Sequence, residues 1–172
     1  PLKREWRFQR GLTRTLARVN ETITDRTNLI CDDLEAAMDR WSGRPAIAFE
    51  GRRLSYAELE ALANRYAHWA QGQGIRRGET VALFMPNRLD YLPIWFGLSK
   101  VGVVTALINN QLVGDALAHC LRISGASHCL VDEETAEAFG AVRESLGRPV
   151  SEWTLAETRQ GQHSLVQALR SC

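Results

Sequence analysis

The chain has 172 residues, of which 45% are hydrophobic and 24% charged; these proportions are globular and exclude a disordered or fibrous protein. The formal net charge of +1 does not favour a protein that binds nucleic acid. The four cysteines form no CxxC pair, so we expect free thiols in a reducing compartment, the cytoplasm.

The first twenty residues favour a basic amphipathic helix, which we extend to residue 24. On a helical wheel the apolar side chains fall within an arc of roughly 160°, and the basic ones occupy the opposite arc of about 120°. Six basic residues stand against one acid, Glu5, so this segment has a charge of +5. Such a helix can lie on an anionic membrane surface, or it can pack on its own domain with its arginines in solvent. The candidates for contact with a membrane surface are Trp6, Arg7, Phe8, Arg10, Arg14 and Arg18.

The next part of the chain favours two helices, a β-hairpin and a strand. The strongest local signal is the capping box of Ser55 and Glu58, which starts a helix. In chain order we expect a helix capped by Asn28 that reaches Trp41, a hairpin with strands at 46–49 and from Leu54, a helix from Ser55 to Gly72, and a strand at 81–84.

Helices and apolar strands then alternate up to residue 149. The expected elements are a helix over 89–98, a strand at 103–108, a helix capped by Asp115 that reaches Ile123, a strand at 128–131 and a helix over 133–146. This alternation is typical of an α/β fold, a doubly wound and mostly parallel sheet with helices on both faces.

Two stretches limit the domain organisation. The most apolar one, 91–108, contains Pro93 and a central Lys100, so we predict no transmembrane helix. For the polar stretch 151–172 we predict no helix or strand. The sequence therefore divides into an N-terminal helix (1–24), one α/β unit (25–150) and an unassigned tail (151–172).

Motifs with a chemistry of their own are missing from the sequence. It has no GxGxxG, GxxxxGK[ST], GxSxG or HExxH pattern. The pairs His119-Cys120 and His128-Cys129 could each lend at most one metal ligand easily, because adjacent side chains point apart. We therefore assign no catalytic, cofactor-binding or metal-binding residue.

One loop lies where doubly wound sheets bind ligands. Asn109, Asn110 and Gln111 follow a predicted parallel strand, and the carboxyl ends of such strands are the usual ligand edge. These three residues are the candidates for a substrate-edge loop. Asparagines in such a loop also serve to hold the turn together, and both interpretations stay open.

Several segments resemble the opening of the AMP-forming, adenylate-forming synthetases. They are Ala46–Leu59 with Ala63-Asn64-Arg65, Val81–Asn87 and Trp95–Gly102. Ala106-Leu-Ile-Asn-Asn110 with Leu117–Gly125 is similar to the fatty acid transport protein / very-long-chain acyl-CoA synthetase branch. That branch usually has Asn-x-Asn-Leu here, and Gln111 replaces its second asparagine. The resemblance covers about residues 27–135.

The resemblance implies the N-terminal portion of an adenylate-forming synthetase fold and a two-step reaction. A fatty carboxylate attacks the α-phosphate of ATP with the help of magnesium, and the thiol of coenzyme A then displaces AMP. The family's phosphate loop, adenine segment, ribose-binding aspartate and C-terminal lysine have no match in these 172 residues. No catalytic residue is therefore carried over, and we expect no cofactor to be bound by this chain alone.

The function implied by the resemblance is that of a fragment of a long-chain fatty-acid–CoA ligase, inactive by itself. The alternatives are a membrane- or lipid-associated module without catalysis and one half of a split ligase. The expected partners are the remainder of the synthetase, on the same or a second chain, and an anionic membrane surface, without nucleic acid. The expected location is the cytoplasm, at the inner membrane face where residues 1–20 contact lipid. A fragment of this kind should leave a sheet edge and apolar surface uncovered.

Overall fold

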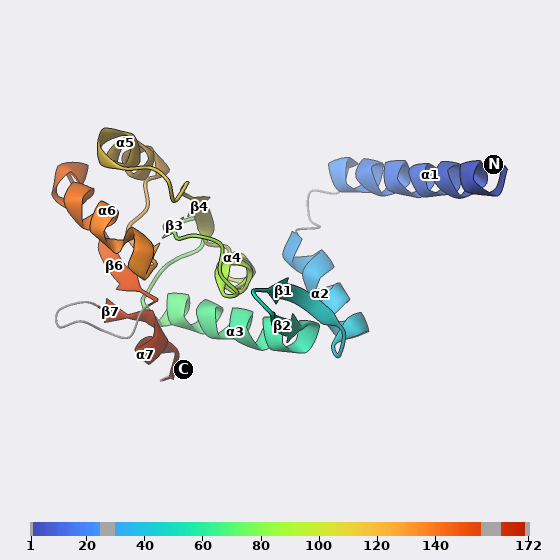
Figure 1. Cartoon of the computed structure of the whole chain (residues 1–172), viewed down its shortest axis with the longest axis horizontal. Helices are drawn as coiled ribbons and strands as arrows, with labels where there is room; N and C mark the ends of the chain where they lie inside the picture. Colours follow the sequence, from blue (N-terminus) through green and yellow to red (C-terminus); the bar gives the residue numbers. More distant parts are fainter. Residues whose placement is uncertain (1, 25–29, 156–162, 171–172) are drawn as a thin grey trace.

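The computed structural model describes residues 2–24, 30–155 and 163–170; the remaining residues, among them Asn28 and Cys172, lie outside the description. Figure 1 shows the arrangement of the elements. The helices are α1 (Leu2–Thr24), α2 (Ile30–Trp41), α3 (Tyr56–Gly72), α4 (Tyr91–Lys100), α5 (Gly114–Ser124), α6 (Glu133–Arg143) and α7 (Leu165–Arg170). The strands are β1 (Pro45–Phe49), β2 (Arg52–Ser55), β3 (Thr80–Phe84), β4 (Val104–Leu107), β5 (His128–Val131), β6 (Ser151–Thr154) and β7 (His163–Ser164).

The main sheet has the strand order β4-β3-β5-β6-β7, and every neighbouring pair is parallel. Strands β1 and β2 form a separate antiparallel hairpin. Its turn places Glu50 and Gly51 at φ of 48° and 76°, and two successive positive φ values are what a tight hairpin turn requires. The predicted doubly wound parallel sheet and the predicted hairpin are both confirmed.

Alternation along β3 divides the core into two layers. Val81 and Leu83 belong to a cluster on one face of the sheet, together with Trp69 of α3 and residues of α4 and α7. Ala82 and Phe84 belong to a cluster on the other face, with residues of α5 and α6. Figure 1 shows these two sets of helices on opposite sides of the strands. A strand buried on both faces in this way reads as a continuous apolar run, which is why the sequence identified β3.

Helices α3 and α4 pack closely against each other at Gly97. A Cβ atom added to Gly97 would lie 2.3 Å from the backbone oxygen of Ala63 and 2.8 Å from Cβ of Tyr66. Nearby, Lys100 Nζ donates to Asn64 Oδ1 at 2.8 Å and lies 3.1 Å from Glu35 Oε1. These contacts join α2, α3 and α4 into one layer beside the sheet.

The structure contains two strands and a helix in the stretch 151–172, for which the sequence predicted no element. Strand β6 pairs with β5 along its length, and Trp153 packs edge-on against Trp69, with ring centroids 5.2 Å apart. Leu165 of α7 is fully buried in the same cluster. Residues 151–155 and 163–170 are therefore part of the α/β unit, and the boundary drawn at residue 150 falls inside it.

Two predicted helix ends differ in detail. Asp115 lies in the first turn of α5, whose cap residue is Val113, without a side-chain cap bond. The predicted helix over 133–146 is α-helical to Arg143 and continues as one 3-10 turn over Glu144–Leu146. The acid remains favourable in the first turn, because it lies at the positive end of the helix dipole.

Helix α1 lies apart from the other described elements (Figure 1). The large apolar side chains described on it are exposed: Trp6, Phe8, Leu12, Leu16 and Val19. No helix in the described part of the chain is long and apolar enough to span a bilayer.

Candidate functional site

The order of the strands creates a switch point at the carboxyl ends of β3 and β5. The chain leaves β3 for β4 on one side and then crosses to β5 on the other side. In sheets with this order, ligands bind in the crevice where the connections part. The loop after β3 and the start of α6 meet at this point, and both carry charged side chains.

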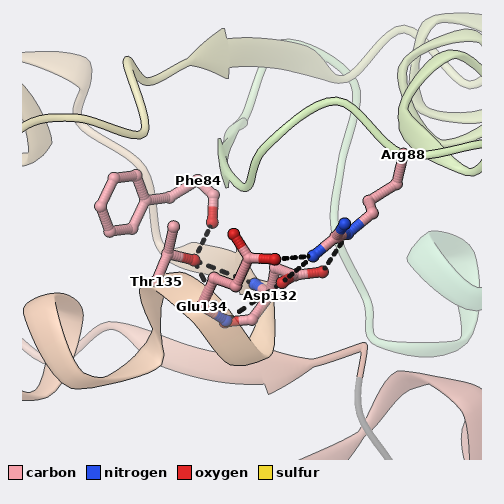
Figure 2. Close-up of polar contacts among 5 residues, drawn as sticks. All are labelled: Phe84, Arg88, Asp132, Glu134 and Thr135. Atoms are coloured by element: carbon pink, nitrogen blue, oxygen red, sulfur yellow. Dashed lines mark hydrogen bonds and ion pairs between the residues drawn. The ribbon is translucent and has the colours of Figure 1, made fainter.

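Arg88, in the loop after β3, binds two carboxylates at the start of α6 (Figure 2). Its Nε donates to Asp132 Oδ2 and its Nη2 to Asp132 Oδ1, both at 3.2 Å, and Nη2 also donates to Glu134. These hydrogen bonds, first to Asp132 and then to Glu134, raise the pKa of Arg88, so it stays charged. A two-point guanidinium–carboxylate contact fixes orientation as well as distance. The cluster therefore holds the β3 loop against α6.

Asp132 and Thr135 bind the backbone at the same place. Asp132 caps α6 by accepting from the Glu134 amide at 3.1 Å, and its own amide donates to Thr135 Oγ1 at 3.1 Å. The Thr135 hydroxyl donates to the carbonyl of Phe84, the last residue of β3, at 2.6 Å. One buried hydroxyl thus links the end of β3 to the first turn of α6, as Figure 2 shows.

Thr135→Val is expected to lower the free energy of unfolding by about 1–3 kcal/mol, since it removes two hydrogen bonds of a buried hydroxyl. The Phe84 carbonyl and the Asp132 amide then keep only the longer hydrogen bond between them, at 3.4 Å. Thr135→Ser keeps the hydroxyl and is the matched control, with an expected loss of less than about 1 kcal/mol. Urea unfolding of the three proteins measures the difference. A loss in Thr135→Ser as large as that in Thr135→Val would contradict the expectation that the hydroxyl contributes more than the methyl group to this junction.

A cavity of about 380 Å³ opens beside the cluster, between the β1–β2 hairpin, α3, the β3 loop and α7. Its basic side chains are Arg52, Arg65 and Arg88, and its acidic ones are Glu50, Asp90 and Asp132. The aromatic side chains of Phe49 and Tyr66 and the apolar side chains of Leu62, Met85, Leu89, Leu155, Val166 and Leu169 form the rest of the wall.

Two of the three acids in this cavity are bound within the protein. Asp132 is held by Arg88, and Asp90 Oδ1 accepts from the Tyr66 hydroxyl at 3.0 Å. Burial, followed by the charge of Asp90, raises the pKa of Tyr66, so its hydroxyl remains a donor. Among the described residues that line the cavity there is no serine, cysteine, histidine or lysine.

The predicted substrate-edge loop lies elsewhere. Asn109 is exposed, and its Oδ1 accepts from the Gln111 amide at 3.0 Å, so this side chain holds the turn after β4. Neither Asn109, Asn110 nor Gln111 lines the cavity. Strand β4 is at the end of the sheet order, which separates its loop from the switch point between β3 and β5.

The membrane-surface candidates lie on α1, away from the switch point. Trp6, Phe8, Arg10 and Arg14 are exposed, and the guanidinium carbon of Arg10 lies 5.1 Å from the centre of the Trp6 ring. The side chains of Arg7 and Arg18 lie outside the described residues.

Sequence reasoning missed Arg88 and Asp132 as a pair. The available signal was their position, since each closely follows a buried strand, and parallel neighbours bring such loops together. The sequence does not show that β3 and β5 are neighbours in the sheet, so it could not predict that these two loops meet.

Metal ligands do not converge in the described ranges of the chain, where no group of three or more His, Cys, Asp or Glu side chains could hold an ion. Cys129 is fully buried, and burial raises the pKa of its thiol. His128 has Nδ1 2.9 Å from the Ser127 hydroxyl. Neither His119-Cys120 nor His128-Cys129 belongs to such a group among the described residues.

Comparison with known proteins identifies relatives over most of this unit. The family model described as AMP-binding enzyme matches residues 34–168. Long-chain fatty acid transport protein 6 of Homo sapiens is 29% identical over 142 residues, which are 81% of this chain and 23% of that protein. The long-chain-fatty-acid–CoA ligase FadD13 of Mycobacterium tuberculosis is 33% identical over 121 residues, which are 69% of this chain and 23% of the ligase. The chain thus spans less than a quarter of the length of these relatives.

Solved structures agree with this placement. The N-terminal domain of FACL13 from Mycobacterium tuberculosis aligns with a TM-score of 0.73 at 27% identity, covering 84% of this chain and 36% of that one. The anthranilate CoA ligase AuaEII, in complex with anthranoyl-AMP, shares the fold with a TM-score of 0.77 at 22% identity, covering 82% of this chain and 27% of the other. Because the family match covers most of the described α/β unit, the chain belongs to the AMP-binding enzyme family and corresponds to an N-terminal part of its members.

Proposed function

We propose that this chain is the N-terminal part of a long-chain fatty-acid–CoA ligase, which joins a fatty acid to coenzyme A through an acyl-adenylate. The observation that carries the proposal is the match over residues 34–168, shared with relatives whose names specify long-chain fatty acids. The doubly wound sheet and its switch-point cavity support a ligand-binding scaffold. The resemblance of Ala106–Asn110 and Leu117–Gly125 to the fatty acid transport branch points to the same substrate class.

These residues by themselves do not fit the family's cofactors. ATP with magnesium needs a loop that cradles phosphate and carboxylates that are free to bind the metal. Asp132 and Glu134 are instead bound by Arg88, and no phosphate loop occurs in the sequence. We therefore assign no step of the reaction to this chain's own residues, and adenylation would require the remainder of the enzyme.

An open sheet edge supports a partner of this kind. In the described strands, β4 pairs with β3 alone. Val104 and Leu107 on β4 are 52% and 45% exposed, and Val113 and Ile123 at α5 are exposed as well. A parallel sheet is normally covered on both faces and protected at its edges. We propose that the remainder of the synthetase, on the same or a second chain, covers this surface.

The proposal is tested by the size and the activity of the native protein. An antibody raised against residues 28–60, followed by mass spectrometry, gives the size of the protein in its source cells, where we expect a product several times longer than 172 residues. That product should exchange pyrophosphate into ATP with palmitate and only weakly with benzoate, whereas residues 1–172 alone should give background exchange.

Other outcomes have distinct meanings. Exchange that appears only when a second chain co-purifies would establish a split ligase. Exchange by residues 1–172 alone, or a preference for benzoate, would contradict the proposal. A native product of 172 residues that brings no partner with it would do the same.

A further inference from the structure

We propose that α1 is an in-plane membrane anchor, which binds the surface of a bilayer that contains anionic phospholipid. The inference does not depend on ligase activity, since α1 ends before the family match begins at residue 34. Helix α1 is therefore not required by the shared fold, and its pattern needs a separate explanation.

The apolar face of α1 is uncovered in the described part of the protein. Trp6 and Phe8 are each 62% exposed, and Leu12, Leu16 and Val19 are exposed as well. They lie on one side of a helix of 23 residues, and Figure 1 shows no other element against it. Five large apolar side chains on one helix face form a surface that normally meets an apolar partner. Packing of α1 on its own domain, the alternative from the sequence, has no support in the described elements.

The positive charge of α1 favours an anionic bilayer over a protein as its partner. The basic residues of the first twenty positions lie on the arc opposite the apolar one and, set against the single acid Glu5, give that segment +5. A protein partner would need a matching acidic rim around an apolar groove, whereas an anionic bilayer offers both at once. The two described arginines, Arg10 and Arg14, are exposed and thus available to lipid phosphates.

Trp6 marks the border between the two faces. The Arg10 guanidinium lies 5.1 Å from the centre of its ring, which places a cation next to an amphipathic indole. Tryptophan is enriched at the headgroup level of membranes, and a neighbouring arginine reaches phosphate from there. No helix in the described ranges can span a bilayer, so the mode of binding that fits α1 is parallel to the surface.

Glu5 is the one charged residue on the apolar arc. Near the helix N-terminus it lies favourably with respect to the helix dipole, but it opposes insertion of the apolar face. We therefore expect Glu5→Leu to strengthen binding to vesicles. A gain in affinity at unchanged helix content would not come from misfolding.

Flotation of the full chain with vesicles tests the proposal. The protein should float with mixed phosphatidylcholine–phosphatidylglycerol vesicles and remain at the bottom with pure phosphatidylcholine. Arg10→Gln together with Arg14→Gln should lower the partition coefficient by about fivefold for each charge removed. Leu12→Gln together with Leu16→Gln should lower it on the order of tenfold or more, through lost apolar burial.

The matched controls remove two arginines or two large apolar side chains from positions outside α1. Arg53→Gln with Arg76→Gln makes the same change in net charge at exposed positions outside α1. Val113→Gln with Ile123→Gln removes two apolar side chains that are 66% and 71% exposed. Both control proteins should float like the parent. Circular dichroism checks that every variant keeps its helix content.

Several results would overturn the proposal. One is equal binding to neutral and anionic vesicles, and another is no binding to either. A third is equal loss of binding in the α1 variants and their controls. A fourth is self-association without lipid that disappears in the Leu12→Gln, Leu16→Gln protein while flotation is absent, since that would make α1 a protein-binding helix.

Discussion

Trp153→Ala is expected to lower the free energy of unfolding by about 3–5 kcal/mol, the usual cost of emptying the site of a buried tryptophan. The side chain is 8% exposed and packs edge-on against Trp69 in the cluster between the sheet and α3. Small domains have only about 5–15 kcal/mol of stability in total, so this one substitution would remove a large share. Thermal and urea unfolding measure the effect.

The matched variant, Trp153→Phe, keeps an aromatic ring and should cost much less than alanine. Ending the chain at residue 150 should be at least as damaging as Trp153→Ala, because it removes the whole of β6 and the buried Leu165 as well. If the protein without residues 151–172 unfolded at the same urea concentration as the parent, the segment would have no role in the core.

Gly97→Ala should destabilise the protein by about 3 kcal/mol, although alanine is the better helix former by about 1 kcal/mol. The new methyl group would lie 2.3 Å from the Ala63 carbonyl oxygen, which is a backbone atom and cannot move aside as a side chain can. Relief would require α3 and α4 to separate along their contact. Chemical denaturation of the purified variant gives the size of the loss.

Gly140→Ala is the control with the opposite expected sign. Gly140 lies within α6 and has nothing within 4 Å of an added Cβ, so only the gain in helix propensity remains. We expect it to stabilise the protein by about 0.5–1 kcal/mol. Equal effects of the two substitutions would show that the close approach of α3 and α4 is not a constraint on the fold.

Local signals in the sequence predicted the elements that depend on local chemistry. The capping box at Ser55 forms as expected, with the Glu58 amide donating to Ser55 Oγ at 3.2 Å and the Ser55 amide to Glu58 Oε2 at 2.8 Å. The apolar run at 81–84 forms the strand that is buried on both faces. In both cases the residues concerned are neighbours along the chain.

Elements that depend on distant partners were missed. Strand β6 has one strongly apolar residue in Ser151-Glu152-Trp153-Thr154, too few for a periodic pattern. Its strand conformation comes from pairing with β5, where Trp153 lies opposite Leu130. The contact between Arg88 and Asp132 likewise joins positions 44 residues apart and exists only because β3 and β5 are neighbours.

The same neighbour relation has a consequence for folding during synthesis. Strand β4 follows β3 after α4 and can pair with it once both have left the ribosome, but β5, which pairs with the other edge of β3, emerges only after α5 has been made. Until then β3 keeps a free backbone edge in a nascent chain, and such edges are prone to pair with other chains. We therefore expect the interval between the emergence of residues 107 and 131 to be the period in which the growing protein depends most on chaperones.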